Sequence, residues 1–371
     1  MHILYDGTIY SIQAVGGVTR YFANIISRLP LDFIPSVIVG EPLIGKLPHH
    51  ENLEVLRYGN SKLNSISPKL DIAHRRVKDA MLRRNVVPRK VDLLHPTYYT
   101  LLSRNLITAY RYPAVLTVWD MIHELFASEL DPLGHHAEEK RRAILAAEKI
   151  ICISHSTRND LLERIKIEES KVHVIHLAAD LDESLSHGDE AVPPQPYYLY
   201  VGTRTTSYKN FPTLLKAFAE ANSQRPELSL CVVGSPFKPD ELELMNRLKI
   251  ADRIHCFGHA NDTQLAKLYR CSLALVYPSL YEGFGIPPLE AMACGTVAVV
   301  GNTSSLPEVV GDAGVMFDPR SPEELADILV WLMDHPSERE TLIRKGRERV
   351  KNFSWDKTAA ETVKIYRSLK D

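Results

Sequence analysis

Two carboxylates, Glu282 and Glu290, flank a glycine-containing turn in the run EGFGIPPLE. Gly283 and Gly285 can take positive φ or let a ligand approach the backbone closely, and prolines after Ile286 are typical of a helix start. The free N–H groups there favour an anion such as a phosphate. Carboxylates beside such a site suit a hydroxyl-rich ligand, so we expect a sugar or a ribose. The alternative is a capping Glu282 and a solvated Glu290.

Two cations, Arg204 and Lys209, follow the apolar run PYYLYVG that ends at Gly202. A strand, a polar loop and a helix in that order place both cations at the carboxyl end of one strand. Such a pair would bind a diphosphate, whose negative charge grows when it leaves a sugar. The alternative is two cations on a surface loop.

Further glycines end other expected strands. Gly16 and Gly17 separate a strand at residues 2–7 from an amphipathic helix, which is the geometry of a phosphate site, although the spacing does not fit the dinucleotide fingerprint GxGxxG. Gly234 and Gly258 follow the runs LSLCVV and RIHCF, where a nucleotide base would be bound. Alternatively, the pair at Gly16 serves only the turn.

The first half of the chain carries polar residues at expected strand ends. His95 and Tyr98 lie in VDLLHPTYY, and Asp120 and His123 end the run AVLTVWDMIHE. Parallel α/β sheets bind ligands at the carboxyl ends of their strands, so these four residues are acceptor candidates, with Asp120 and His123 closest to the chemistry. A capping aspartate and a packed histidine are the alternative. Consecutive histidines at 135–136 face different directions on a helix, so we predict no metal site.

Strands and helices alternate through both halves, which predicts two doubly wound, Rossmann-like α/β domains facing each other across a cleft. We expect a first domain at residues 1–180, a polar, proline-containing linker at 181–196, a second domain at 197–353 and a final helix at 354–371.

The 371 residues are 45% hydrophobic and 24% charged, as in a globular protein. No stretch approaches the roughly 20 apolar residues of a membrane helix, and the start lacks signal-peptide features, so we expect a cytoplasmic protein. Five scattered cysteines without CxxC spacing indicate neither a disulfide framework nor a zinc site. Residues 51–100 hold ten Lys/Arg against five Asp/Glu. This excess, mostly at 75–90, would contact anionic lipid at the inner face of the plasma membrane or form a solvated helix face. Nucleic acid binding is not expected.

The run from Glu282 to Gly295, EGFGIPPLEAMACG, closely resembles the signature of glycosyltransferase family 4, retaining enzymes of the GT-B architecture. The resemblance implies that Glu282 faces the hydroxyls of the donor sugar and that Glu290 accepts from the nucleotide ribose. It also implies that Arg204 and Lys209 bind the diphosphate, that Gly16 and Gly17 lie near it, and that the chemistry needs no metal or cofactor. Backbone donors are expected from three residues: Phe284, Gly285 and Ile286. The resemblance further implies that the final helix at 354–371 packs back towards the first domain.

The chain departs from the family pattern at Trp119, which stands where a histidine usually precedes the aspartate. The runs around Asp120 and Lys209 resemble those of bacterial surface-polysaccharide mannosyltransferases. This implies GDP-mannose as the first donor candidate and a glycan or lipid-linked glycan as the acceptor. Three other readings stay open from the sequence: a glycoside hydrolase, a sugar-nucleotide epimerase and a two-lobed sugar-binding protein.

Overall fold

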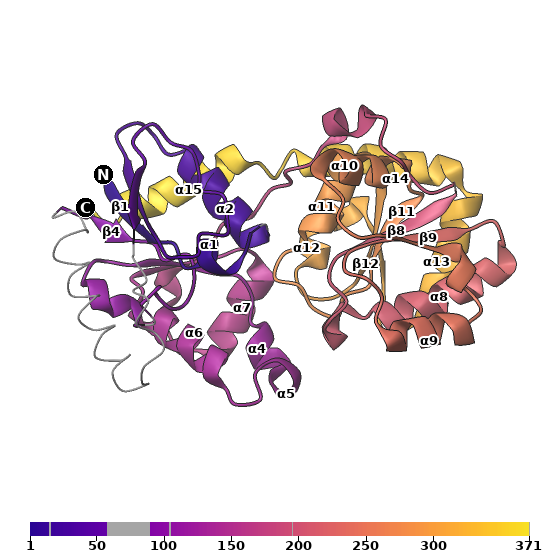
Figure 1. Ribbon diagram of the computed structural model, residues 1–371, viewed down its shortest axis with the longest axis horizontal. Helices are drawn as coiled ribbons and strands as arrows, with labels where there is room; N and C mark the ends of the chain where they lie inside the picture. Colours follow the sequence, from indigo (N-terminus) through magenta and orange to yellow (C-terminus); the bar gives the residue numbers. More distant parts are fainter. Residues whose placement is uncertain (15, 58–89, 104, 195, 371) are drawn as a thin grey trace. The chain divides into compact units, whose positions relative to one another are not determined.

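The computed structural model describes residues 1–14, 16–57, 90–103, 105–194 and 196–370 (Figure 1). The chain forms two compact units. Unit 1 comprises Met1–Ile153, Arg158–His176 and Trp355–Asp371, and unit 2 comprises Ser154–Thr157 and Leu177–Ser354. The final helix, predicted at residues 354–371 to pack back towards the first domain, is part of unit 1.

Unit 1 is built on parallel strands. One sheet has the order β3-β2-β1-β4, and a second has the order β5-β6-β7. A parallel bridge between Leu94 and Ala114 joins the facing edges of the two sheets. The strands are β1 (His2–Asp6), β2 (Ile34–Val39), β3 (Glu54–Arg57), β4 (Leu93–Leu94), β5 (Val115–Val118), β6 (Lys149–Cys152) and β7 (Val172–Val174). Strands β1, β2 and β5 are buried along nearly their whole length, as expected for a parallel sheet covered on both faces.

Helices connect these strands. The helix predicted after the glycine pair is α2, which buries Tyr21, Phe22, Ile25 and Ile26 along one face, and α15 packs against it. The helices up to β7, and the last one, are α1 (Ile9–Ile12), α2 (Gly17–Ser27), η1 (Ile107–Tyr110), α4 (Ile122–Leu125), α5 (Ala127–Leu130), α6 (His135–Ala146), α7 (His155–Arg164), η2 (Glu169–Lys171) and α15 (Trp355–Arg367).

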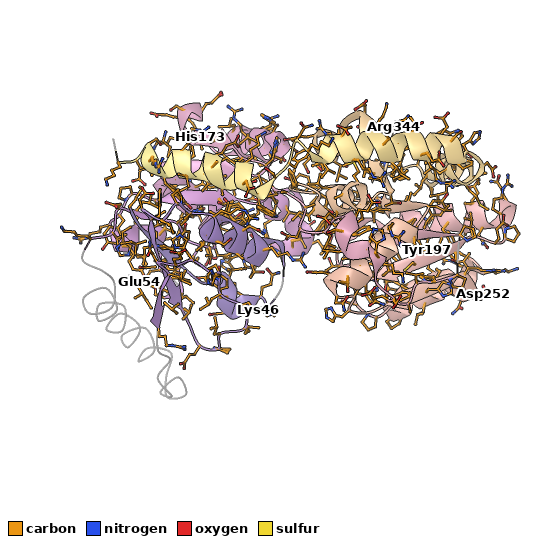
Figure 2. The ribbon with its side chains drawn as sticks, turned by 90° about the horizontal axis from the view of Figure 1, so that it is seen from above. Lys46, Glu54, His173, Tyr197, Asp252 and Arg344 are labelled. Carbon is orange, nitrogen blue, oxygen red and sulfur yellow. The ribbon has the colours of Figure 1, made fainter. Side chains whose placement is uncertain are left out.

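Unit 2 contains one parallel sheet of six strands in the order β10-β9-β8-β11-β12-β13. The direction of the strand order reverses between β8 and β11, which is the switch point at which doubly wound sheets bind ligands. The strands are β8 (Tyr197–Val201), β9 (Ser229–Val233), β10 (Ile254–Phe257), β11 (Ala274–Tyr277), β12 (Val297–Gly301) and β13 (Val315–Phe317). Tyr197, labelled in Figure 2, is fully buried at the start of β8.

Helices cover both faces of this sheet: α8, α9 and α13 lie on one side and α10, α11 and α14 on the other (Figure 1). The helical elements are η3 (Glu183–His187), η4 (Ser207–Lys209), α8 (Phe211–Gln224), α9 (Pro239–Arg247), η5 (Ala251–Arg253), α10 (Asp262–Cys271), α11 (Ile286–Ala293), α12 (Leu306–Val310), η6 (Gly311–Ala313), α13 (Pro322–Asp334) and α14 (Pro336–Val350).

The segment predicted as a linker, residues 181–196, packs onto unit 2. Its helix η3 contacts α10, Lys267 Nζ donates to the Gly188 carbonyl at 2.7 Å and Arg270 Nε donates to the Ser186 carbonyl at 3.2 Å. The polar character of the segment therefore serves hydrogen bonds to α10.

Two sequence expectations concern membranes. Across the described ranges, no helix is both long and apolar enough to span a bilayer. The basic stretch at 75–90 lies outside the described residues except for Lys90, which is exposed.

Candidate active site

The centre of the candidate site is an ion pair between Lys209 and Glu282. Lys209 Nζ lies 2.7 Å from Glu282 Oε1, and the two side chains are only 13% and 12% exposed. Lys209 ends η4, the next helical element after β8, and Glu282 lies in the loop after β11. The two strands are neighbours at the switch point of the sheet. The fold thus brings together, from positions 73 residues apart, a cation and a carboxylate that the sequence assigned to a diphosphate and a sugar.

Two tyrosine rings lie close to the Lys209 ammonium group. Lys209 Nζ lies 5.1 Å from the centre of the Tyr208 ring and 5.7 Å from that of Tyr277. Burial raises the pKa of Tyr277 well above its usual value, and the nearby Glu282 charge raises it further. The Tyr277 hydroxyl therefore stays neutral, so this ring adds no charge beside Lys209.

Hydrogen bonds from the connection between β12 and α12 fix the EGFG loop. Glu282 N donates to Ser304 Oγ at 2.9 Å, while Ser305 Oγ donates to the carbonyls of Glu282 and Phe284 at 2.9 and 2.7 Å. Gly285 has φ +111°, a conformation that L side chains rarely adopt. The loop therefore reaches α11 in one defined conformation, with its backbone N–H groups at the helix start.

The residues of the turn before α11 differ in how far they are buried. Phe284 is buried, and its ring packs edge-on against that of Phe353 with 5.9 Å between ring centres. Gly283 and Ile286 are partly buried at either side of it. The predicted backbone donors Phe284, Gly285 and Ile286 thus lie together at the start of α11.

Glu290 lies one turn further along α11 and is buried, where its Oε2 accepts a hydrogen bond of 3.2 Å from the Tyr269 hydroxyl. The alternative of a solvated Glu290 is therefore wrong. A carboxylate held this way inside a protein can accept from ligand hydroxyls without first being ordered.

Arg204 is held differently from Lys209. Its side chain is 3% exposed, its Nε donates to Glu241 Oε1 at 2.9 Å, and its guanidinium carbon lies 5.2 and 4.8 Å from the centres of the Phe211 and Phe237 rings. Its Nη1 is buried without a hydrogen-bond partner in the described structure. Arg204 is therefore not a surface cation, and the alternative of two cations on a surface loop is wrong for it. Its Nη1 is the guanidinium nitrogen that would be available to bind an anion.

Two of the predicted glycines of unit 2, Gly202 and Gly234, lie close together, and Gly234 lies beside Arg204. A Cβ on Gly234 would lie 2.5 Å from the Gly202 carbonyl oxygen and 3.1 Å from Arg204 Nη1. Both glycines have positive φ, +142° for Gly202 and +154° for Gly234. Gly258 follows the next strand, β10, and a Cβ there would meet no atom within 4 Å. The ends of β8 and β9 thus approach each other in a way that needs glycine, while the end of β10 is open.

In unit 1, Gly16 and Gly17 open α2. Gly16 N donates to Thr19 Oγ1 at 2.9 Å, and Thr19 Oγ1 donates to the Gly16 carbonyl at 2.8 Å. The φ of Gly16 is 173°, an extended conformation open to any residue. The backbone conformation of this turn therefore does not require a glycine at position 16.

His95, predicted to bind the acceptor, has no exposed surface. Its Nδ1 hydrogen bonds with the Tyr366 hydroxyl at 2.6 Å and its Nε2 with Thr117 Oγ1 at 2.9 Å. Burial lowers the pKa of His95 to about 3. Both ring nitrogens are used inside the core against α15, so the structure gives His95 a packing role and does not support direct acceptor contact.

Asp120 and His123 follow β5, as expected. Asp120 Oδ1 accepts from Ile122 N, the first residue of the one-turn helix α4, at 3.1 Å. The His123 ring lies 5.1 Å from that of His136. Burial lowers the pKa of His123, and the Lys140 charge lowers it further. Asp120 and His123 both stay partly exposed.

Two aromatic residues near Asp120 complete this region. Trp119, at the position of the family histidine, packs edge-on against Tyr21 at 5.0 Å and Phe22 at 6.1 Å between ring centres. Trp119 therefore replaces a polar group with core packing. Burial raises the pKa of Tyr98, with a further contribution from the charge of Asp120, so Tyr98 lies near the predicted acceptor residues.

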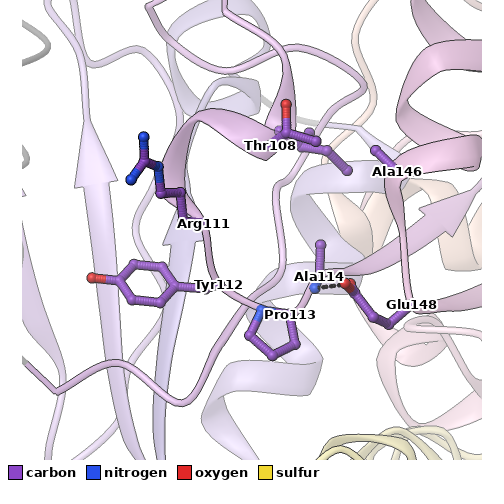
Figure 3. Close-up of a pocket in the computed structure, with 8 residues that line it drawn as sticks. Thr108, Arg111, Tyr112, Pro113, Ala114, Ala146 and Glu148 are labelled. Atoms are coloured by element: carbon purple, nitrogen blue, oxygen red, sulfur yellow. Dashed lines mark hydrogen bonds between the residues drawn. The ribbon is translucent and has the colours of Figure 1, made fainter.

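A surface cavity of about 340 Å³ lies elsewhere in unit 1 (Figure 3). It is found where β5 and β6 begin, and Glu148 Oε2 accepts there from Ala114 N at 2.5 Å. Doubly wound sheets bind substrates at the opposite, carboxyl edge, and none of the eight lining residues belongs to the predicted site.

Two family models match the chain in succession. The model described as Glycosyltransferase Family 4 matches residues 15–183, and that described as Glycosyl transferases group 1 matches residues 183–349. The chain belongs to glycosyltransferase family 4. The protein is thus a glycosyltransferase, which removes support from the hydrolase, epimerase and binding-protein readings.

Relatives of this glycosyltransferase include the O-antigen chain mannosyltransferase B of Escherichia coli, 26% identical over 380 residues, which cover 95% of this chain and 96% of that protein. Two solved structures confirm the GT-B fold. Sucrose-phosphate synthase from Thermosynechococcus elongatus has a TM-score of 0.77 at 21% identity, covering 99% of this chain and 98% of that one. The Anabaena protein HepE, in complex with UDP and glucose, has a TM-score of 0.70 at 16% identity, covering 99% and 100%.

Proposed function

We propose that this glycosyltransferase is a retaining hexosyltransferase that moves a sugar from a nucleotide donor to a hydroxyl of a glycan or lipid-linked glycan in surface polysaccharide synthesis. GDP-mannose is the first donor candidate. The name of the Escherichia coli relative supports both mannose and a polysaccharide acceptor, and its match extends over nearly the whole chain. The UDP and glucose bound to the Anabaena neighbour support a nucleotide sugar as the kind of donor.

The observation that carries this proposal is the Lys209–Glu282 pair at the switch point of the unit 2 sheet. A nucleotide sugar presents a dianionic diphosphate next to a ring of hydroxyls. Lys209 offers the cation that the diphosphate needs, and Glu282 offers a carboxylate that accepts from hydroxyls. The start of α11 adds backbone N–H groups on the same side.

In the proposed reaction the bond between the anomeric carbon and the diphosphate oxygen breaks, and the acceptor oxygen forms a new bond to that carbon. Negative charge grows on the leaving diphosphate, so Lys209 and the α11 N–H groups stabilise the transition state more than the bound donor. The proton of the acceptor hydroxyl passes to the leaving phosphate on the same face. This route keeps the anomeric configuration and needs no protein nucleophile.

Without donor, Lys209 and Glu282 neutralise each other. We infer that donor binding changes this arrangement: Lys209 turns to the diphosphate and Glu282 to a sugar hydroxyl. Glu290, buried and held by Tyr269, would accept from the ribose. Asp120 and His123 of unit 1 would bind the acceptor. A divalent metal is not required in this scheme, so activity should persist in EDTA.

A transfer assay with product analysis tests the proposal. The protein is incubated with GDP-mannose, UDP-glucose or UDP-N-acetylglucosamine and a panel of lipid-linked and free oligosaccharides, and the product linkage is determined by NMR. An axial mannosyl linkage from the α-linked donor supports retention. An inverted linkage, or release of free sugar with every acceptor, contradicts it. Sedimentation with anionic vesicles tests the predicted membrane contact.

A further inference from the structure

Lys140, in the middle of α6, is an unusual residue of unit 1 because its side chain is 0% exposed. An ammonium group is almost never fully buried unless it is paired, because transfer of an isolated charge out of water is very costly. The contacts of Lys140 therefore indicate why the chain keeps a cation there.

Those contacts all lead to the connection after β5. Lys140 Nζ donates to the Asp120 carbonyl at 3.0 Å and to Glu124 Oε2 at 2.9 Å, and it lies 3.6 Å from Asp120 Oδ1. It also lies 5.5 Å from the centre of the Tyr99 ring, whose hydroxyl accepts from Trp119 N at 3.2 Å. One buried cation thus fixes both the backbone and the carboxylates of the segment that bears the acceptor candidates.

The geometry leaves particular polar atoms available. In the described structure, the contacts of the Asp120 carboxylate use Oδ1, and the side chain is 30% exposed. His123 Nδ1 and Glu124 Oε1 are buried and have no hydrogen-bond partner among the described residues. Buried polar atoms are rarely left unsatisfied, so a group of them beside a partly exposed carboxylate indicates a place for ligand hydroxyls.

We propose that Lys140 is a positioning residue of the acceptor site, which holds Asp120 and Glu124 so that Asp120 Oδ2, His123 Nδ1 and Glu124 Oε1 bind hydroxyl groups of a polyol acceptor. This inference rests on the proposed function. It adds to that function a residue that does not touch substrate and a chemical class for the ligand of unit 1.

The charges around His123 fit this arrangement. Lys140 and His136 lower its pKa in addition to burial, while Asp120 and Glu124 raise it. Their combined effect keeps the imidazole neutral at neutral pH, so it can accept a hydrogen bond from a hydroxyl at one nitrogen and donate at the other. Removing the Lys140 cation should raise the pKa of His123.

Kinetics of Lys140→Met test the inference, with Arg141→Met as the matched control on the same helix, because Arg141 is exposed and pairs with Glu138 on the surface. We expect Lys140→Met to lower kcat/KM for the acceptor by about tenfold or more, as for loss of a hydrogen bond to a charged group. Donor affinity by calorimetry should stay unchanged, and Arg141→Met should resemble the wild type in both.

A second variant guards against misfolding. Lys140→Met leaves the carboxylates of Asp120 and Glu124 without their cation. In Lys140→Met/Glu124→Gln only the Asp120 carboxylate is left unpaired, so this variant should be less destabilised. If the single variant does not fold, the double variant should lose more acceptor kcat/KM than Glu124→Gln alone, because Glu124 itself is a proposed acceptor ligand. In either folded variant, the acidic limb of the pH profile of kcat/KM should move to higher pH, which a purely structural role would not cause.

The results separate the two proposals. If the wild type transfers sugar and the folded Lys140 variants keep the acceptor kcat/KM and its pH profile, the role of Lys140 is overturned and the proposed function stands. Parallel loss of donor and acceptor binding would indicate a structural role only and also overturn it. If the wild type binds no nucleotide sugar, the proposed function fails, and the inference falls with it.

Discussion

The Lys209–Glu282 ion pair predicts that two conservative substitutions, Lys209→Met and Glu282→Gln, affect nucleotide binding in opposite directions. Lys209→Met removes the cation that we assign to the diphosphate. Glu282→Gln keeps a hydrogen-bond acceptor for Lys209 but removes a negative charge close to where the diphosphate would bind. Both variants change one side chain of a pair whose atoms lie 2.7 Å apart.

The sizes of the effects follow from burial. Because the pair is nearly excluded from water, the carboxylate that Lys209→Met leaves unpaired should cost about 1.5–3 kcal/mol of stability. Loss of a donor to the developing charge should raise the barrier by about 3–4 kcal/mol and slow turnover by about 10²–10³-fold. Glu282→Gln loses a charged acceptor for a sugar hydroxyl, which corresponds to about a tenfold to hundredfold fall in turnover.

Nucleotide binding separates the two variants. In Glu282→Gln, Lys209 no longer has to leave a carboxylate, so a free nucleoside diphosphate should bind more tightly than to the wild type. In Lys209→Met the same ligand should bind more weakly. Calorimetry with the nucleoside diphosphate gives the affinity, and single-turnover transfer gives the rate.

A matched control lies in the same unit. Arg225 and Asp334 also form an ion pair, with both side chains 35% exposed, on the surface formed by α8 and α13. Asp334→Asn should change neither affinity nor turnover, since exposed pairs contribute little. If Glu282→Gln instead loses binding and turnover equally, Glu282 does not act on the sugar, and the division of roles is refuted.

Three further predictions concern single residues. Burial lowers the pKa of His95 to about 3, below its unfolded value, so the unfolded chain takes up the proton first; stability should fall by about 1.4 kcal/mol per pH unit below pH 6.5. Urea unfolding of the protein at pH 7 and pH 5 should show a smaller loss of stability in His95→Gln than in the wild type; equal pH dependence of both would contradict it. Cys256 is exposed, whereas burial raises the pKa of Cys152 to about 12. A thiol reagent should therefore react fast at Cys256, and a fast phase that survives in Cys256→Ser would disprove this. Gly285→Ala places a Cβ 2.8 Å from Leu306 at φ +111°, which should cost about 1–3 kcal/mol and weaken nucleotide binding. Gly258→Ala, which meets no atom, is its control, and equal melting temperatures would be the contrary result.

The sequence predicted the elements of the fold well because hydrophobic periodicity is local. The apolar runs before Gly202, Gly234 and Gly258 became β8, β9 and β10, and the helix after Gly17 buries the expected face. Strand order, in contrast, depends on contacts far apart in the chain. The sequence assigned Lys209 and Glu282 to one ligand, but their direct pairing follows from the neighbouring positions of β8 and β11.

Two residues show why the remaining parts of the site were harder to predict. His95 has the expected place at a strand end, but Tyr366, 271 positions later on α15, covers it. The burial of Lys140 was not predicted, because Lys140 is one of several charged residues in this helix. Its position does carry information, since Lys140, Ala143 and Ile144 share the buried face of α6. A lysine at helical spacing with apolar residues indicates a buried cation, and hence buried carboxylate partners.

The most direct test of the proposed function is calorimetric titration of the protein with GDP-mannose, UDP-glucose, UDP-N-acetylglucosamine and the corresponding free nucleotides, repeated with Lys209→Ala. We predict that one nucleotide family binds and that Lys209→Ala weakens that binding. If none of these ligands binds, or if the substitution leaves the affinity unchanged, the assignment of the Lys209–Glu282 site to a nucleotide-sugar donor is contradicted.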